Sequence, residues 1–331
     1  MKSIILFLPS NKNHIRLFHK ICQELPKNSS LFITQEPYKN ENSETELNYL
    51  GINYKKLEHY TKNDPSFILE QEKIGVIVVG NDTDVIPQWF INCANKKKIP
   101  SVLIQDGLMF DINKNSSGKI KKFKIILKKS NLKLVFLSIK LLIKKQYFQL
   151  SDGQAGCTQI HVWGKTTKNF FLSKNIPEKS LFITGNPLMP SYQHDSPKSH
   201  KTILFTVSDL VETGILNYKE FKKMIQNICN TILDFPEIKL IIKFHPRESQ
   251  NLWPNLPLSS NVSITSQSFE IEAKTADLLL TNLSTTAIEF LAMKKPVIIY
   301  FPNIEKYIAS NSFPRDIIDK KLVYYSDSTN S

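Results

Sequence analysis

The stretch IIKFHPRES, Ile241 to Ser249, joins a strand of buried type to a group of ionisable side chains. Its apolar start favours a strand inside a sheet. Pro246 restricts His245 to an extended backbone and ends the strand, because proline donates no ladder hydrogen bond. The stretch therefore predicts a histidine at a strand end, with Lys243 and Arg247 on either side, where an anion can bind. The alternative is a histidine that only hydrogen-bonds a loop carbonyl.

Outward from this stretch, strand-like and helix-like segments alternate along the chain, which is typical of βαβ units and a parallel sheet. The predicted strands are SIILFLP, SLFIT, IGVIVVG, PSVLIQ, QIHVWG, SLFITG, TILFTVS, IKLIIKF, ADLLLTN and KPVIIYF. The predicted helices are HIRLFHKICQEL, IPQWFINCANK, TKNFFLSKN and EFKKMIQNICNTIL. The last of these places Phe221, Ile225, Ile228 and Ile232 on one face.

The length and composition suit two domains of this kind. A chain of 331 residues with 41% hydrophobic content can bury two cores. The polar segment PSYQHDSPKSHK, residues 190–201, holds two prolines and lacks apolar periodicity, so it is the predicted linker. We therefore expect two Rossmann-like α/β domains, residues 1–190 and 200–331, facing each other across a cleft.

Other sequence features exclude several classes of protein. The four cysteines lie far apart without CxxC spacing, which indicates neither a zinc site nor a disulfide framework and fits a reducing cytoplasm. The start, MKSIILFLPSNK, has a short apolar run and no small-residue cleavage site, so it predicts a first strand and not a signal peptide. No segment is long and apolar enough to predict a membrane span.

A second strand end carries three hydroxyl side chains. In LLLTNLSTTAIEF, Ser284, Thr285 and Thr286 stand where a helix begins, and the free N–H groups and dipole of such a helix favour a phosphate. Plain capping explains one of these hydroxyls, not three. Glu289 lies in the first turns of the helix, where it can accept hydrogen bonds from ribose hydroxyls. It could equally be a surface carboxylate stabilised by the helix dipole.

A third strand end carries a carboxylate. In VLIQDGL, Asp106 follows a buried strand and Gly107 releases it into a turn, so we expect the carboxylate to point into the interdomain cleft. A purely structural turn carboxylate is the alternative. The segment GNDTD, residues 80–84, ends another strand of the same domain. It is a weaker candidate because Asn-Asp-Thr is also ordinary capping sequence.

These motifs together carry a family resemblance. Gln105-Asp106-Gly107, His245-Pro246 and LSTTAIEF, preceded by HVWGKTTKNFF and ITGNP, resemble bacterial GT-B glycosyltransferases of surface polysaccharides such as capsule and lipopolysaccharide. The chain is most similar to the sialyltransferase and polysialyltransferase-like group and to relatives that transfer Kdo or glycerol phosphate. In the sialyltransferase group an acidic pair before glycine supplies the general base, while His-Pro and Ser/Thr pairs bind the donor phosphate. The resemblance implies Asp106 as the base.

By the same resemblance, His245, Ser284 and Thr285 contact the donor phosphate, and residues 1–190 and 200–331 bind acceptor and nucleotide donor respectively. Gln105 stands where the group has its first acid, and related polysaccharide enzymes carry Gln-His-Gly there. TGNP is commoner in the glycerol-phosphate and Kdo relatives, so the donor stays open between a CMP-activated sugar and CDP-glycerol. No DxD motif ends a strand of the second domain, so we expect metal-independent chemistry without a cofactor.

Most of the net charge of +13 comes from one segment. Residues 112–150 hold eleven lysines and no acidic residue. If the segment is helical, Lys129, Lys133, Lys140 and Lys144 form one stripe and most of the remaining surface is apolar. Such a helix suits an anionic membrane surface, and the alternative is a helical excursion packed on its own domain with solvated lysines. Nucleic acid is a less fitting partner, because interleaved arginines and RNA motifs are absent.

The sequence thus predicts a cytoplasmic glycosyltransferase, peripheral on the inner face of the membrane. It would move a sugar, such as sialic acid or a related CMP-activated sugar, from a nucleotide donor to a hydroxyl of a surface glycan or lipid-linked acceptor. Three alternatives remain open: a CDP-glycerol-type glycerophosphotransferase, a nucleotide-sugar epimerase and a non-catalytic protein that binds anionic lipid.

Overall fold

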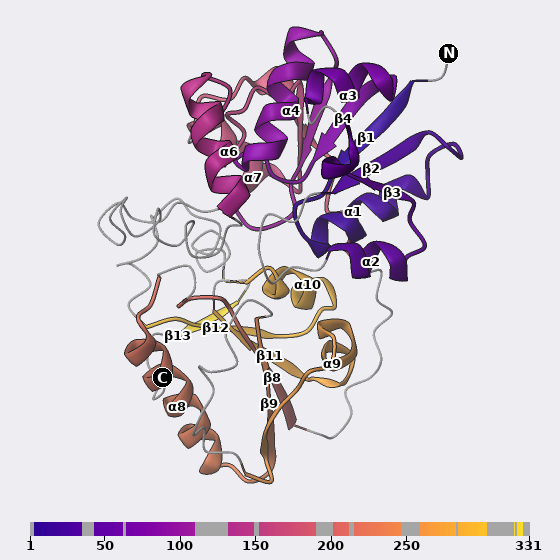
Figure 1. Ribbon diagram of the computed structural model, residues 1–331. Coiled ribbons are helices and arrows are strands. Elements are labelled where there is room, and N and C mark those ends of the chain that lie inside the picture. Colours follow the sequence, from indigo (N-terminus) through magenta and orange to yellow (C-terminus); the bar gives the residue numbers. More distant parts are fainter. Residues whose placement is uncertain are drawn as a thin grey trace. The chain divides into compact units, whose positions relative to one another are not determined.

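A computed structural model describes residues 3–34, 43–61, 64–109, 132–148, 152–189, 201–211, 215–245, 259–282, 284–302, 321 and 323–326. The described residues within Met1–Gly107 and Ile126–Leu188 form one compact unit, and those within Met189–Ser331 belong to a second. Each unit is built on its own parallel sheet (Figure 1). The predicted linker lies outside the described residues apart from Lys201, so its bounds stay a prediction.

The first unit contains β1 (Ile4–Leu8), α1 (Lys12–Cys22), β2 (Ser30–Thr34), α2 (Ser43–Tyr49), β3 (Tyr54–Lys56), α3 (Pro65–Gln71), β4 (Ile74–Val79), α4 (Val85–Lys96), β5 (Ser101–Ile104), α6 (Leu132–Ile143), β6 (Gln159–Val162), α7 (Lys165–Ser173) and β7 (Leu181–Ile183), with short 3-10 helices at Leu57–His59 and Glu178–Ser180. The second contains β8 (Lys201–Val207), α8 (Tyr218–Leu233), β9 (Ile238–Phe244), β10 (Val262–Ile264), α9 (Phe269–Thr275), β11 (Leu278–Thr281), α10 (Thr286–Ala292), β12 (Val297–Tyr300) and β13 (Tyr324–Ser326).

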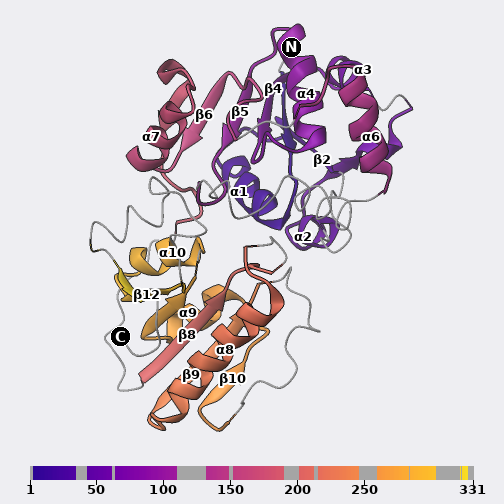
Figure 2. The ribbon, with the colours of Figure 1, turned by 90° about the vertical axis from the view of Figure 1, so that its left-hand side faces the viewer.

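The first sheet is covered on both faces. Its strand order is β3-β2-β1-β4-β5-β6-β7, and neighbouring strands in it are parallel. Leu6 and Phe7 are adjacent on β1 and both are fully buried, and adjacent strand residues point to opposite faces. Figure 2, which turns the ribbon by 90°, shows helices of this unit on either side of the strands. Burial on both faces explains why these strands are continuous apolar runs.

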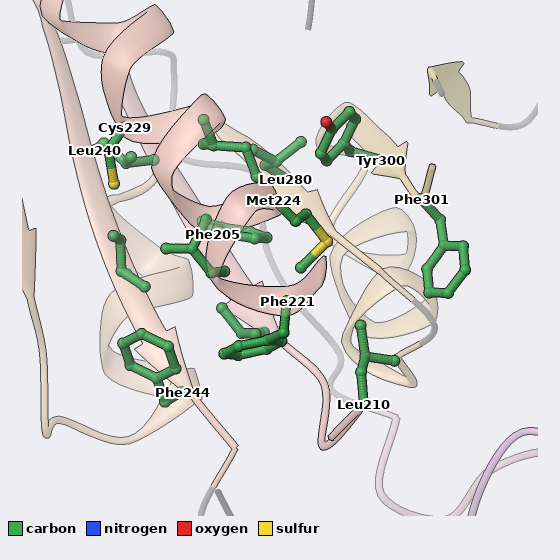
Figure 3. Packing of buried hydrophobic residues seen from close by; sticks show 14 of the residues in the cluster. Phe205, Leu210, Phe221, Met224, Cys229, Leu240, Phe244, Leu280, Tyr300 and Phe301 are labelled. Atoms are coloured by element: carbon green, nitrogen blue, oxygen red, sulfur yellow. The ribbon is translucent and has the colours of Figure 1, made fainter. Parts of the chain in front are cut away.

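The second sheet has the order β10-β9-β8-β11-β12-β13 and is also parallel. Figure 3 shows α8 packed over it, and Phe221, Met224 and Cys229 of this helix form one buried cluster with Phe205 of β8 and Leu240 of β9. On the other face Phe290 of α10 joins a separate cluster. The predicted apolar stripe of α8 is confirmed, because all four of its members are buried.

The ten predicted strands are all present, and the sequence missed three others among the residues that the structure describes. β3, β10 and β13 are three-residue strands at sheet edges. An edge strand pairs with a neighbour on one side only. Because β3 and β13 also leave most of their side chains partly or fully exposed, such short strands do not require a long apolar run. The residues that define the interior of each sheet are therefore the ones that the sequence reveals.

Candidate functional site

The carboxyl ends of β1, β4 and β5 form the first candidate site. β2 lies on one side of β1, and β4 lies on the other. The connection from β1 to β2 and the connection from β4 to β5 therefore run in opposite directions along the sheet. Doubly wound sheets bind ligands at such a switch point, outside the carboxyl ends of the strands. Asp106, which follows β5, lies at this edge, and its predicted place in a cleft between the domains stays a prediction.

Asp106 is paired with a histidine that sequence reasoning missed. Oδ2 of Asp106 lies 2.5 Å from Nε2 of His14, in the first turn of α1. The His14 side chain is fully buried, whereas the Asp106 side chain is 26% exposed. The only sequence signal for His14 was its position shortly after the first strand. A parallel sheet brings that position to the same edge as Asp106.

Gln105 explains how this chain departs from the acidic pair of the sialyltransferase group. Its buried amide donates from Nε2 to the carbonyl of Gly107 at 2.7 Å. Its Oε1 accepts the backbone N–H of Trp163 at 2.8 Å, and its backbone carbonyl accepts the indole N–H of Trp163 at 2.9 Å. A carboxylate could not make the donating bond. Gln105 therefore fixes the turn that carries Asp106, and Asp106, which is partly exposed, is the single acid at these two positions.

The weaker candidates in GNDTD have different surroundings. Asp82 is fully buried and accepts the backbone N–H groups of Gly153 and Ala155, each at 3.0 Å. Burial raises the pKa of Asp82 above its ordinary value, and these two bonds oppose the shift. Asp84, the residue before α4, also has its pKa raised by burial, and the nearby His14 and a hydrogen bond with Ser10 oppose that shift. Asp82 is thus a structural anchor, while Asp84 belongs to the surroundings of the pair formed by His14 and Asp106.

The second sheet has its own switch point, between β8 and β11. A chain of hydroxyls crosses it. Thr206 Oγ1 lies 2.8 Å from Thr281 Oγ1 and 2.8 Å from Thr286 Oγ1, and the Thr286 hydroxyl donates to Ser284 Oγ at 2.8 Å. Ser284 Oγ also accepts the backbone N–H of Thr286 at 3.3 Å. Thr285, which caps α10, makes no side-chain capping bond, so the predicted hydroxyls have different roles.

His245 directly follows β9, and the structure describes the residues before it but not those immediately after it. His245 is partly buried at the strand end, and Pro246 and Arg247 lie outside the described residues. Lys243 donates from Nζ to the carbonyl of Gln267 at 2.5 Å. Burial lowers the pKa of Lys243, and the carboxylates of Glu270 and Glu272 oppose the shift. The ammonium of Lys243 is therefore engaged with the loop that precedes α9.

Glu289 lies on α10 and is partly buried. Burial and, as the smaller cause, the neighbouring Glu270 together raise its pKa to about 7. A surface carboxylate next to a helix N-terminus would have the opposite tendency. Glu289 is therefore not a fully exposed, dipole-stabilised surface carboxylate, and its contact with a ribose stays a prediction.

We expect Glu289→Gln to flatten the pH dependence of stability. The folded-state pKa of Glu289 is raised, so its stabilising contribution is complete below its ordinary value of 4.5 and is lost as the pH rises through about 7. Between pH 5 and pH 8 the wild type should lose about 1–3 kcal/mol in free energy of unfolding that the variant does not lose. Urea unfolding at both pH values measures this difference. The control is Glu24→Gln, at an exposed site. If both variants change the pH dependence of the free energy of unfolding by the same amount, the prediction is wrong.

The described part of the basic segment forms α6 and the turn after it. Leu141 is buried, and the backbone carbonyls of Gln146 and Phe148 are bound by side-chain amides of α4. Phe136 and Ile143 are 72% and 79% exposed, and Ile139 is exposed between them. Lys140 and Lys144 are exposed as well, whereas Lys129 lies outside the described residues, as does the side chain of Lys133. Among the described helices, none is long and apolar enough to cross a membrane.

One segment of the second unit matches the model of a known protein family. Residues 220–321 match the family model of CDP-glycerol:poly(glycerophosphate) glycerophosphotransferase. The segment matched contains His245, Ser284 and Glu289 and covers less than half of the chain. No curated protein matches the sequence. The family match agrees with the prediction of a nucleotide-dependent transferase.

Solved structures resemble the whole chain. UDP-GlcNAc 2-epimerase from Neisseria meningitidis bound to UDP-GlcNAc has a TM-score of 0.61 at 16% identity, over 97% of this chain and 87% of that one. UDP-GlcNAc 2-epimerase from Methanocaldococcus jannaschii, in complex with UDP-GlcNAc and UDP, has 0.60 at 16%, over 98% and 88%. The glycotransferase of kitacinnamycin has 0.56 at 13%, over 98% and 86%. These likenesses confirm the predicted GT-B class of two Rossmann-like domains.

Proposed function

We propose that this protein is a glycosyltransferase that moves a sugar from a nucleotide donor, in the first instance a CMP-activated one, to a hydroxyl of a surface glycan or lipid-linked acceptor. The observation that carries the proposal is the match of residues 220–321 to a family of cytidine-nucleotide-dependent transferases. The motif resemblance to the sialyltransferase group, which also uses cytidine donors, agrees with it and adds Asp106 from outside the matched segment. Neither a metal nor a cofactor takes part in the proposed reaction.

In this reaction Asp106 accepts the proton of the acceptor hydroxyl. The acceptor oxygen forms a bond to the anomeric carbon, while the bond from that carbon to the phosphate oxygen breaks. The nucleotide leaves with that electron pair, so its phosphate gains negative charge. His245 and the hydroxyls of Ser284 and Thr285 bind this phosphate in the second unit, where hydrogen bonds to developing charge lower the barrier. Glu289 binds the ribose.

A glycerophosphotransferase is the second candidate, because the family whose model matches residues 220–321 is one of glycerophosphotransferases. There the acceptor oxygen would attack phosphorus of CDP-glycerol, and CMP would leave with the electrons of the broken P–O bond. The epimerase neighbours favour a third candidate, which would convert a UDP-sugar without any acceptor. A non-catalytic protein that binds anionic lipid would bind none of these nucleotides.

Nucleotide binding followed by product analysis tests these candidates. We expect thermal stabilisation by CMP or CDP in preference to UDP and GDP. Incubation with a CMP-sugar or with CDP-glycerol, each with and without a glycan acceptor, should release CMP only when the acceptor is present. Transfer of the donor sugar to the acceptor supports the glycosyltransferase, and transfer of glycerol phosphate to the acceptor supports the glycerophosphotransferase. Conversion of a UDP-sugar without acceptor, or failure to bind any nucleotide, would contradict both.

We expect His245→Ala to weaken nucleotide binding and turnover together. A ligand to the donor phosphate acts in the ground state and in the transition state, and a charge-assisted hydrogen bond is worth about 1.5–3 kcal/mol. Calorimetric titration with the preferred nucleotide and steady-state kinetics measure the two losses. His19→Ala, on the partly exposed surface of α1, is the matched control. An unchanged nucleotide affinity in a folded His245→Ala variant would return His245 to a loop-supporting role.

We also propose that the basic segment holds the protein on the inner face of an anionic membrane. The exposed side chains of Phe136, Ile139 and Ile143 share α6 with Lys140, and this combination of apolar and basic groups suits a lipid interface. The eleven lysines of residues 112–150 supply the complementary charge. A lipid-linked acceptor would be presented at such a surface.

Replacing Lys129, Lys133, Lys140 and Lys144 with glutamine should remove most binding to anionic liposomes. Wild-type binding should weaken with salt, because attraction to the surface is screened within about 8–10 Å. Flotation at two ionic strengths measures both effects. An equal charge change on the second unit, Lys219, Lys222, Lys223 and Lys239 to glutamine, should leave binding largely intact. Turnover of a short soluble acceptor should survive in both variants, and equal wild-type binding to neutral liposomes would contradict electrostatic docking.

A further inference from the structure

We propose that His14 is a positioning residue, which holds the Asp106 carboxylate in the orientation needed to take the acceptor proton. The inference rests on the proposed function, because it concerns the base of that reaction. It goes further in assigning a role to a residue that no motif identifies. The assignment follows from the hydrogen bonds of the imidazole, its burial and the glycine on which it lies.

The first step is the position of the ring proton. Nδ1 of His14 accepts the backbone N–H of Ser10 at 3.0 Å, so Nδ1 is an acceptor and carries no proton. The proton of the neutral ring is therefore on Nε2. Nε2 in turn donates to Oδ2 of Asp106 at 2.5 Å. A backbone amide thus selects the tautomer that bonds the carboxylate, and it does so whatever side chain stands at position 10 other than proline.

The second step is that His14 is not itself the base. Its side chain is fully buried and both ring nitrogens are engaged, so the imidazole has no free acceptor for a substrate proton. A proton relay through the ring would require Nδ1 to take a proton, and the N–H of Ser10 occupies that position. Asp106, whose side chain is partly exposed, is the member of the pair that can meet an acceptor.

The third step is that the fold leaves room for this ring. A Cβ built on Gly80 would lie 2.6 Å from Cδ2 and Nε2 of His14, which is closer than real Cβ atoms approach other atoms. Gly80 follows β4 and does not have a positive φ, so only the space taken by the imidazole excludes a side chain there. Phe18 lies near the ring one turn further along α1, with centroids 5.9 Å apart. His14 is therefore held between α1 and the end of β4.

A fixed carboxylate matters because general-base catalysis depends on geometry. Oδ2 of Asp106 is bound to His14, which leaves Oδ1 to accept the proton of the acceptor hydroxyl as the acceptor oxygen bonds to the donor carbon. A misplacement of about 1 Å at a reacting group can lower a rate by about 10²-fold. Loss of the His14 bond is expected to lower turnover by about 10–100-fold with nucleotide affinity unchanged.

The experiment is a double-mutant cycle on turnover. His14→Leu removes the donor, whereas His14→Gln keeps a side-chain N–H near the place of Nε2 and should retain most of the turnover. In the Asp106→Asn background, His14→Leu should cost little more, because two residues that act as a unit are not additive. Gly80→Ala, which displaces the ring without changing its chemistry, should lower turnover as His14→Leu does. His19→Leu on the same helix is the control.

Additive losses for His14 and Asp106, or equal losses for His14→Gln and His14→Leu, would overturn the positioning role. Nitrogen-15 NMR of labelled histidine gives a readout independent of activity: His14 should be protonated at Nε2 and not at Nδ1, and Asp106→Asn should shift that N–H resonance. The opposite tautomer would also overturn the proposal. If the wild-type protein transfers no group from any nucleotide donor, the proposed function fails, while NMR still decides whether His14 holds Asp106.

Discussion

Replacing Asp106 with asparagine is expected to lower turnover by about 10²-fold or more while nucleotide affinity stays nearly unchanged. Asparagine keeps the shape of the side chain and can still accept the N–H of His14, but its amide cannot take a proton from the acceptor. The donor ligands of the proposed site lie in the second unit, so binding of CMP or CDP should not depend on Asp106. Steady-state kinetics and calorimetric titration separate the two quantities.

A matched control for this variant is Asp64→Asn. Asp64 is an exposed carboxylate that caps α3 by accepting the N–H of Ser66 at 2.9 Å, and asparagine caps a helix equally well. Both stability and turnover should therefore be unchanged. Near-normal turnover in Asp106→Asn would exclude Asp106 as the base. Asp84, whose pKa is affected by His14, would then be the next residue to replace.

Replacing Asp82 with alanine is expected to destabilise the protein by about 2–5 kcal/mol. The substitution leaves the buried N–H groups of Gly153 and Ala155 without the acceptor that each has at 3.0 Å. Each unsatisfied buried donor costs about 1–3 kcal/mol. Urea unfolding at constant pH measures the loss, which should appear in the midpoint and not in the slope.

The matched control is Glu24→Ala, an exposed carboxylate replaced in the same unit, with an expected change within about 0.5 kcal/mol. Asp82→Ala should also leave the nucleotide affinity of a folded sample intact, because the donor ligands belong to the second unit. Wild-type stability in Asp82→Ala would show that other groups satisfy the two N–H donors. A selective loss of turnover without loss of stability would return Asp82 to the catalytic candidates.

The sequence by itself determined the class of fold. Runs such as IKLIIKF and IGVIVVG are apolar at successive positions because central parallel strands are buried on both faces, and that requirement is visible without coordinates. The edge strands β3, β10 and β13 were not visible, because three residues with pairing on one side need little apolar character. The apolar stripe of α8 was predictable too, because burial of one helix face leaves a pattern of apolar residues in the sequence.

Part of the candidate site was also determined locally. A residue that directly follows a buried strand must lie at the carboxyl edge of the sheet, so Asp106 and His245 could be identified from the chain alone. The hydroxyls of Ser284, Thr285 and Thr286 could be identified too, but their separate roles could not. Whether a hydroxyl faces Thr206 or remains without a capping bond depends on the neighbouring strand.

Only the tertiary structure revealed the partner of Asp106. His14 and Asp106 are 92 residues apart in sequence, and their contact exists because β1, β4 and β5 are neighbours in the sheet. The order of parallel strands is set by packing of the crossover helices on both faces, which local sequence does not encode. The same order separates Asp82, whose carboxylate accepts two backbone N–H groups, from Asp106, whose side chain is 26% exposed and paired with His14.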